Sequence, residues 1–306
     1  MKNFYSPCKL CPRNCGVDRL AGEKGFCGES ALLRIAFAGL HRGEEPPLVG
    51  SGGSGTIFVS GCNLGCAFCQ NYQISQGEGS ARLGAMVSAE DFAEICVKLR
   101  DRGAENINIV TGSHAIPAIV EGISAARKAG VNLPVLWNSS AYETPEALEL
   151  LRDHGDIFLP DLKTTNSGIA AKFFNAPDYP AVAQTAILKM CEMAKAREKV
   201  IVRHLILPGY LESTRLALRW FADNAKDRAL LSLMTQYTPI PGRGQTAPDR
   251  YLSADEYETV LGWLEEFKIE DGFCQELVTG SDWLPGFTRA NPFSSELSVP
   301  VWHFSG

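Results

Sequence analysis

Short apolar runs alternate with helix-patterned segments along most of the chain. Runs of four to eight apolar residues bounded by Gly, Pro or polar residues are typical of buried strands. Six strands are expected on this pattern, at Ile57–Ser60, Ile107–Thr111, Pro134–Asn138, Ile157–Asp161, Val200–Leu207 and Leu230–Gln236. Successive β/α units favour a parallel sheet that right-handed crossovers curl. We therefore predict an α/β fold, a partial (β/α)6 TIM-like barrel.

Two helices between these strands have clear end signals. Ser88 and Asp91 have the spacing of a capping box, which predicts a helix that begins there and reaches Arg100. A second helix is expected over Ala115–Ala129, because Gly130 follows it as a helix-ending glycine. Both helices connect consecutive strands, as a β/α barrel requires.

The first 50 residues are expected to be rich in loops. We predict a small cysteine-rich metal-binding module over 1–50 and a barrel with a C-terminal extension over 51–306. The stretch Gly50–Gly55 (GSGGSG) is interpreted as a flexible joint or as a close approach of backbone to a metal cluster. Glu44 and Glu45 precede two prolines, and we expect a solvated acidic turn there, although these side chains could reach the active site.

Composition and charge exclude several classes of protein. The chain has 306 residues and a net charge of −6, which argues against nucleic acid or an anionic membrane as a general partner. It has no apolar run of membrane-spanning length and no apolar signal core near residue 1, so a cytoplasmic location is expected. The ten cysteines include CxxC spacings, which in a long intracellular chain indicate metal rather than disulfides. Cys96 shares a helical face with apolar residues and is expected to be a buried thiol.

Three cysteines follow the first predicted strand with the spacing Cys62-x3-Cys66-x2-Cys69. Gly65 is expected to provide a positive φ that lets this loop wrap back on itself. Three thiolates suit a four-iron cluster, because they leave one iron open to a small molecule. The alternative is a zinc site with three cysteines and a fourth ligand from elsewhere.

Four further cysteines lie near the N-terminus with the spacing Cys8-x2-Cys11-x3-Cys15-x11-Cys27. Four thiolates can hold either a tetrahedral zinc ion or a complete iron–sulfur cluster. A segment of this size has little core of its own, so a bound metal would supply folding energy. The sequence predicts a second metal site here and leaves zinc and an auxiliary cluster both open.

Polar residues follow each predicted strand. In parallel α/β folds the chemistry lies at the carboxyl ends of the strands. Arg203 and His204 alternate on one strand, so only one of them faces the interior, and we predict that it is Arg203. Asp161 and Lys163 are either site residues or a salt bridge that closes the barrel rim.

The motif Cys-x3-Cys-x-aromatic-Cys, with Phe68 as the aromatic residue, resembles the signature of the radical S-adenosylmethionine (SAM) superfamily. Further stretches resemble the family of proteins related to pyruvate formate-lyase activating enzymes: CPRNCGVDRLAGEKGFCG, EEPP, GSGTIFVSGCNLGCAFCQNYQIS, NINIVTGSH, DIFLPDLK, VRHLILPG and MTQY. The resemblance implies that a [4Fe–4S] cluster on Cys62, Cys66 and Cys69 binds SAM and cleaves it to a 5′-deoxyadenosyl radical that abstracts hydrogen. It also implies the same six-unit partial barrel.

The resemblance assigns further residues to cofactor binding, with two departures from the family pattern. The expected SAM-binding residues are Thr111, Gly112, Ser113, Asn138, Asp161, Lys163 and Arg203. The family's Gly-Gly-Glu-like stretch reads Thr-Gly-Ser-His here, so its acidic residue is missing, and His114 is either a ligand contact or a helix-start residue. Asp161 matches one of two aspartates that hold a monovalent cation beside SAM in the family, whereas Asn138 replaces the other.

The resemblance also implies partners. Flavodoxin or ferredoxin is the expected electron donor, and the leading expected activity is the formation of a glycyl radical on a partner enzyme. The alternatives are radical modification of a small molecule or peptide, and a non-catalytic metal-binding protein.

Overall fold

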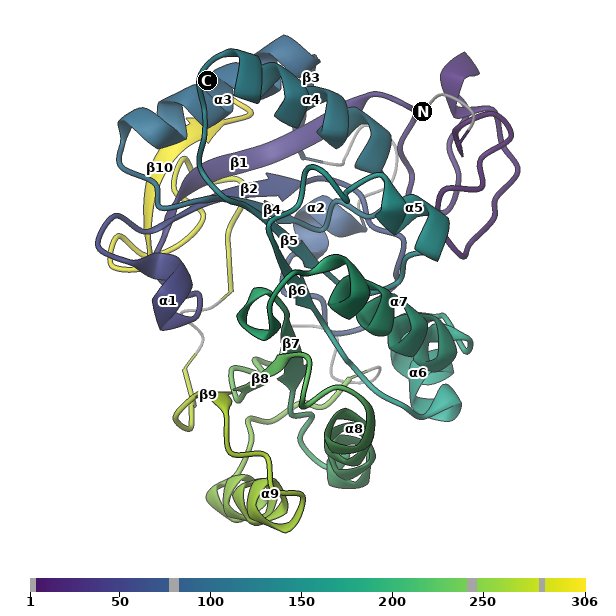
Figure 1. Ribbon diagram of the computed structural model, residues 1–306, viewed down its shortest axis with the longest axis vertical. Helices are drawn as coiled ribbons and strands as arrows, with labels where there is room; N and C mark the ends of the chain where they lie inside the picture. Colours follow the sequence, from purple (N-terminus) through teal and green to yellow (C-terminus); the bar gives the residue numbers. More distant parts are fainter. Residues whose placement is uncertain (1–3, 77–82, 241–246, 281–283) are drawn as a thin grey trace.

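The computed structural model describes residues 4–76, 83–240, 247–280 and 284–306. Its centre is a row of parallel strands in the order β2, β4, β5 and β6, which is continued by β7, β8 and β9 (Figure 1). These strands are β2 (Ser54–Val59), β4 (Ile107–Val110), β5 (Val135–Ser139), β6 (Ile157–Pro160), β7 (Ile201–Leu205), β8 (Leu230–Met234) and β9 (Gly272–Cys274).

Two isolated parallel bridges, Phe158 to Val200 and Asp161 to Arg203, connect β6 with β7. They join the two sheets into one curved wall, and Figure 1 shows its outer strands apart from each other, β10 at the upper left and β9 at the lower left. The predicted six-stranded partial barrel is confirmed, and β9 adds one short parallel strand to it.

The two predicted helices, α3 and α4, begin within one residue of their expected starts. The hydroxyl of Ser88 accepts a hydrogen bond from the Asp91 amide at 3.1 Å, and the Asp91 carboxylate accepts one from the Ser88 amide at 2.8 Å. This capping box starts α3. The helices are α1 (Pro46–Val49), α2 (Tyr72–Ser75), α3 (Ala89–Asp101), α4 (Ile116–Lys128), α5 (Pro145–Glu149), α6 (Ser167–Phe174), α7 (Tyr179–Met193), α8 (Leu211–Asn224) and α9 (Ala254–Glu266), with short 3-10 turns at Arg19–Ala21 and Arg197–Lys199. Among the helices of the described ranges, none is both long and apolar enough to cross a lipid bilayer.

The expectation that residues 1–50 are loop-rich is wrong for one long segment. Strand β1 (Leu33–His41) lies antiparallel between β2 and β10 (Ser298–His303), and β3 (Ala85–Val87) also pairs with it. All but one of the residues of β1 are buried, which explains why its sequence does not alternate between apolar and polar residues. A strand of the main sheet thus begins within the range predicted for the N-terminal module.

The glycine-rich stretch before β2 makes a close backbone contact, although not with the cysteine loop. A Cβ on Gly52 would lie 1.8 Å from the Gly103 carbonyl oxygen. The Glu105 carboxylate accepts hydrogen bonds from the amides of Ser51 and Gly52, at 3.0 and 2.9 Å. These contacts fix the amino end of β2, at the opposite end of the strand from the cysteine loop.

The hydrophobic core fills the space between the sheet and its helices. Trp137 on β5 and Phe92 on α3 are among its largest fully buried side chains. Cys96 belongs to the same core at 1% exposure, as predicted. This core holds the strand ends at fixed positions around the site.

Candidate active site at the carboxyl ends of the strands

The cysteine loop, residues 62–69, begins with a sharp turn at Gly61. Gly61 has φ +88°, and a Cβ there would lie 2.7 Å from the Glu29 side chain and 2.8 Å from His114 Nε2. Only glycine fits this conformation and this space. The prediction that Gly65 has a positive φ is wrong, because the reversal occurs at Gly61 instead.

The C-terminal end of α6 holds the cysteine loop in place. The amides of Gly65 and Ala67 donate to the carbonyl oxygens of Phe174 and Phe173, at 3.1 and 2.8 Å. Phe68, the aromatic residue of the motif, packs edge-on against the rings of Phe173 and Phe174, with centroids 5.8 and 5.7 Å away. The apolar residue between the cysteines therefore anchors the loop while the thiols face elsewhere.

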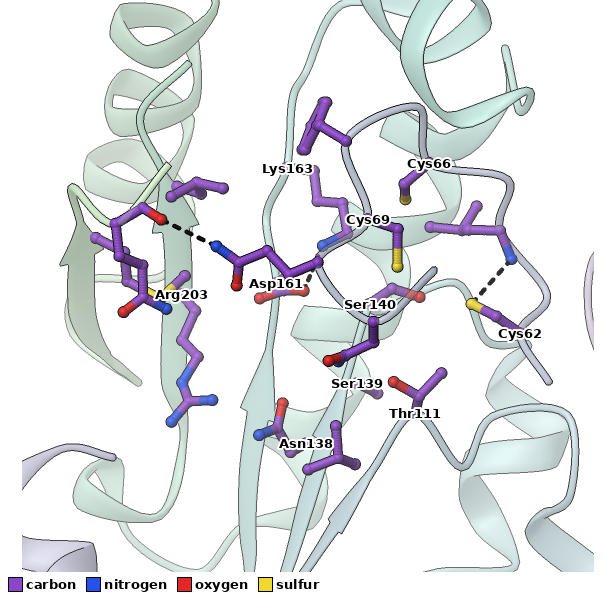
Figure 2. Close-up of a pocket in the computed structure, with 18 of the residues that line it drawn as sticks. Cys62, Cys66, Cys69, Thr111, Asn138, Ser139, Ser140, Asp161, Lys163 and Arg203 are labelled. Carbon is purple, nitrogen blue, oxygen red and sulfur yellow. Dashed lines mark hydrogen bonds and ion pairs between the residues drawn. The ribbon is translucent and has the colours of Figure 1, made fainter. Parts of the chain in front are cut away.

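All three thiols of the loop line one pocket (Figure 2). The Leu64 amide donates to Cys62 Sγ at 3.4 Å, and Cys69 Sγ lies 3.2 Å from the Ser75 hydroxyl. Burial raises the pKa of Cys62 to about 12 and also raises the pKa of Cys66. At neutral pH these side chains therefore ionise only with a compensating cation such as iron.

The pocket is a cavity of about 270 Å³ at the carboxyl ends of the parallel strands. Five of the predicted cofactor-binding residues line it together with the cysteines: Thr111, Asn138, Asp161, Lys163 and Arg203. They come from the ends of β4, β5 and β6 and from β7 (Figure 2). The strand-end rule thus located the pocket, although it did not establish what each residue binds.

Thr111 has an unusual backbone conformation. Its φ is +65°, which is strained for a β-branched residue and costs about 1–3 kcal/mol. The Thr111 amide donates to the Asn138 carbonyl oxygen at 3.0 Å, which holds the strained turn against the end of β5. Strain of this kind at a pocket wall is a common mark of a functional site.

Gly112 and Ser113 lie behind the pocket wall rather than in it. A Cβ on Gly112 would lie 2.6 Å from the Trp137 ring, and the Ser113 hydroxyl donates to Glu143 Oε1 at 2.6 Å. Glu143 is buried, also accepts from Trp137 Nε1 at 3.2 Å, and has a pKa raised by burial. Sequence reasoning missed this carboxylate, because its only signal is a glutamate shortly after a strand end.

His114 is also buried, at the start of α4. Its Nε2 lies 2.9 Å from the Ser60 carbonyl oxygen, and its own carbonyl accepts from Arg19 Nη1 at 2.7 Å. These contacts connect α4 to the turn before the cysteine loop. They favour the interpretation of His114 as a helix-start residue over that of a ligand contact.

Asp161 and Lys163 form an ion pair inside the pocket. Lys163 Nζ lies 2.5 Å from the Asp161 carboxylate, and each side chain is about a fifth exposed, at 23% and 22%. Burial alone would lower the pKa of Lys163, but Asp161 and Cys66 raise it above its usual range. The sequence analysis treated a salt bridge and a place in the site as alternatives for Asp161 and Lys163. The structure shows both, since the two side chains form a salt bridge and also line the cavity.

Arg203 faces the barrel interior and His204 faces outward, as predicted. His204 Nδ1 lies 2.6 Å from the Leu162 carbonyl oxygen, and its Nε2 lies 3.0 Å from the Thr214 hydroxyl on α8. Burial lowers the pKa of His204 to about 4, so the ring is neutral at physiological pH.

Glu44 and Glu45 do not form the solvated turn expected from the sequence. Arg203 Nε donates to Glu45 at 2.9 Å, and Arg203 Nη2 contacts both carboxylates. Asn108 Nδ2 donates to Glu44 at 2.8 Å. The expectation failed because the partner cation lies about 160 residues away along the chain.

The N-terminal cysteine segment contacts the cysteine loop directly. Arg13, between Cys11 and Cys15, donates to the carbonyl oxygens of Asn63 and Asn175, at 2.8 and 2.6 Å. Burial raises the pKa of Cys11 to about 12. The segment thus packs against the loop that carries the other three thiols.

Within the described ranges, no three Cys, His, Asp or Glu side chains converge closely enough to hold a single metal ion. The thiols at 62, 66 and 69 fit a four-iron cluster nevertheless, because each would bind a different iron, and their sulfurs need only line one cavity. The N-terminal metal site stays a prediction.

Residues 56–221 match the Radical SAM superfamily. An uncharacterised protein of Methanocaldococcus jannaschii is 31% identical to the chain over 275 residues, which are 88% of this chain and 77% of that protein. These matches span more than half of the chain and include the cysteine loop.

Solved structures share the fold at low sequence identity. A maturase of the [FeFe]-hydrogenase, HydG, matches with a TM-score of 0.54 and 14% identity over 71% of this chain and 50% of that chain. SuiB of Streptococcus suis, bound to its precursor peptide SuiA, matches with a TM-score of 0.51 and 16% identity over 70% of this chain and 46% of that chain. The chain thus spans about half the length of these two proteins. The extent of the sequence matches shows that the chain belongs to the radical SAM superfamily.

Proposed function

We propose that Cys62, Cys66 and Cys69 hold a [4Fe–4S] cluster and that SAM occupies the adjoining part of the cavity. When bound, these groups supply the electron and the 5′-deoxyadenosyl radical that abstracts hydrogen from a substrate. The observation that carries the proposal is the placement of three thiols on one wall of a cavity whose next wall is formed by polar strand ends.

The chain's own residues bind and orient the cofactor. The Asp161–Lys163 pair offers one charge of each sign to the amino and carboxylate groups of SAM. Asn138 offers an amide, and the backbone turn at Thr111 stays fixed because its N–H is already bonded. Phe58 and Val110 provide apolar lining that keeps water away from a reactive radical.

The finer activity that we propose is glycyl-radical formation on a partner enzyme, with flavodoxin or ferredoxin as electron donor in the cytoplasm. It is supported by the sequence resemblance and by the barrel wall, whose outer strands β9 and β10 do not pair with each other. The alternative is radical modification of a small molecule or peptide. Anaerobic incubation with a candidate glycyl-radical enzyme, followed by electron paramagnetic resonance (EPR) spectroscopy of the product, separates them. A doublet on the partner supports activation, whereas deuterium transfer from a small molecule or peptide supports the alternative.

The second proposed metal is held by Cys8, Cys11, Cys15 and Cys27, as zinc or as an auxiliary iron–sulfur cluster. It is supported by the donor set and by the nearness of Cys27 to Cys8 and Cys15, since a negative charge on either of them would raise the pKa of Cys27.

The cluster assignment is tested by the reduced EPR spectrum. SAM is expected to shift this spectrum in the wild-type protein, whereas Cys66→Ala should remove the shift. The matched control is Cys96→Ala, which removes a thiol buried in the core. A shift that persists in Cys66→Ala would refute the assignment.

A further inference from the structure

The pocket has two ends with different chemistry. The three thiols lie at one end, and Arg203 lies on the opposite side, with Asn138 and Asp161 between them (Figure 2). Glu44 lines the cavity with Arg203 and bonds to its guanidinium. If a cofactor bound to an iron occupies only the thiol end, the Glu44 end remains for another group.

The Glu44 end has an excess of negative charge. Glu44 and Glu45 share the single guanidinium of Arg203, and the three side chains are 10%, 6% and 9% exposed. Lys163, the other cation among the described lining residues, is already paired with Asp161. Two carboxylates therefore face one guanidinium, with one negative charge in excess.

The neighbouring histidine does not neutralise that charge. His41 lines the same end, and its Nδ1 accepts a hydrogen bond from the Gly43 amide at 3.0 Å. Burial lowers the pKa of His41, so its ring is neutral at physiological pH. A buried charge without full compensation is costly, and a buried ionisable group in a cleft is a candidate for contact with a ligand.

Hydrogen-bond acceptors are also in excess at this end. One oxygen of Glu44 accepts from Asn108 and the other accepts from Arg203, which leaves further lone pairs of the carboxylate unused. Asn108 itself does not line the cavity, so its amide group holds Glu44 in place from behind. A ligand that complements this end must therefore donate hydrogen bonds and carry positive charge.

We propose that Glu44 is a specificity-determining residue that binds a protonated amine or guanidine of the substrate. The inference rests on the proposed function, because it assumes that SAM occupies the thiol end. Phe58, Leu205 and Phe293 line the same cavity and provide an apolar surface for the chain that carries the cation. Both a small molecule and a peptide side chain can present this combination.

The test measures the binding of small probes to the iron-loaded, SAM-bound protein by its thermal unfolding midpoint. Pentylamine should raise the midpoint saturably, whereas pentanoate and 1-pentanol should not. In Glu44→Gln the apparent affinity for pentylamine should fall about tenfold or more, because the uncompensated carboxylate is gone. The matched control is Glu94→Gln, which changes an exposed carboxylate on α3 and should bind pentylamine as the wild type does.

Three results would overturn the inference. The first is tighter binding of pentanoate than of pentylamine by the wild-type protein, a comparison that needs no variant to fold. The second is unchanged pentylamine affinity in Glu44→Gln. The third is an equal loss of SAM affinity in that variant, which would place Glu44 in the cofactor site. Release of 5′-deoxyadenosine is measured on the same samples, so failure of SAM cleavage with retained amine binding would count against the proposed function alone.

Discussion

Arg13 provides a sensitive test of how the cysteine loop is held. Its guanidinium donates to Asn63, inside the loop, and to Asn175, at the end of α6, at 2.8 and 2.6 Å. It also stacks over the Phe26 ring, with its central carbon 3.7 Å from the centroid. Arg13→Ala removes these three contacts, together with a longer hydrogen bond to the Phe174 carbonyl oxygen at 3.5 Å, and leaves the seven clustered cysteines in place.

The expected cost follows from these contacts. Hydrogen bonds from a charged donor at a half-exposed site contribute roughly 1 kcal/mol each, and an exposed cation–π contact contributes about 0.5 kcal/mol. Together these contacts contribute about 2.5 kcal/mol to holding the loop against α6 and the N-terminal segment. If a chelator reaches the iron only when the loop opens, the loss of about 2.5 kcal/mol accelerates iron release roughly 60-fold, since about 1.4 kcal/mol corresponds to a factor of ten.

The assay is anaerobic transfer of iron from the reconstituted protein to a coloured chelator, followed over time. Lys24→Ala is the matched control, because it removes an exposed cation from the same segment. Arg13→Lys should recover only part of the protection, since an ammonium group lacks the planar fork that reaches both carbonyls. Iron release at the wild-type rate in Arg13→Ala would refute the idea that this side chain holds the loop.

Three further predictions follow from the site and the core. Asn138→Ala and Asp161→Ala should each weaken SAM binding by about 1–3 kcal/mol in a titration with the cluster intact, and unchanged affinity in both would place the cofactor elsewhere. The pKa of His204 falls from 6.5 to about 4 on folding, so the unfolded state binds the proton first. The free energy of unfolding should therefore decrease by up to about 1.4 kcal/mol per pH unit as the pH falls from 6.5 towards 4, and His204→Gln should show a smaller slope in urea titrations. A protein lacking all three loop cysteines should still contain zinc or iron, and a folded, metal-free protein would disprove the N-terminal site.

The parallel strands could be predicted because their signals are local. Each is an apolar run that ends in polar residues, and the capping box at Ser88 is contained within four residues. Strand β1 (Leu33–His41) is an equally apolar run, but it lies between the two groups of cysteines, in a range that was expected to be rich in loops. Its role depends on pairing with β10, about 260 residues later, which no local pattern reveals.

The site could be predicted in part for the same reason. The spacing of the thiols and the strand-end rule identified the pocket and five of its lining residues. The burial of Glu44 and Glu45 against Arg203, and that of Glu143 behind the wall, depends on contacts between distant segments. Charged residues near prolines and strand ends usually lie in solvent, so the sequence pattern alone favoured the wrong environment.

The most direct test of the central claim is the product of SAM cleavage under reducing, anaerobic conditions. With dithionite and SAM, the iron-loaded protein should release 5′-deoxyadenosine slowly, and a substrate deuterated at the reacting carbon should accelerate release and transfer deuterium to the 5′ carbon. Methylthioadenosine as the product, or 5′-deoxyadenosine that never acquires substrate deuterium, would contradict hydrogen abstraction by a 5′-deoxyadenosyl radical.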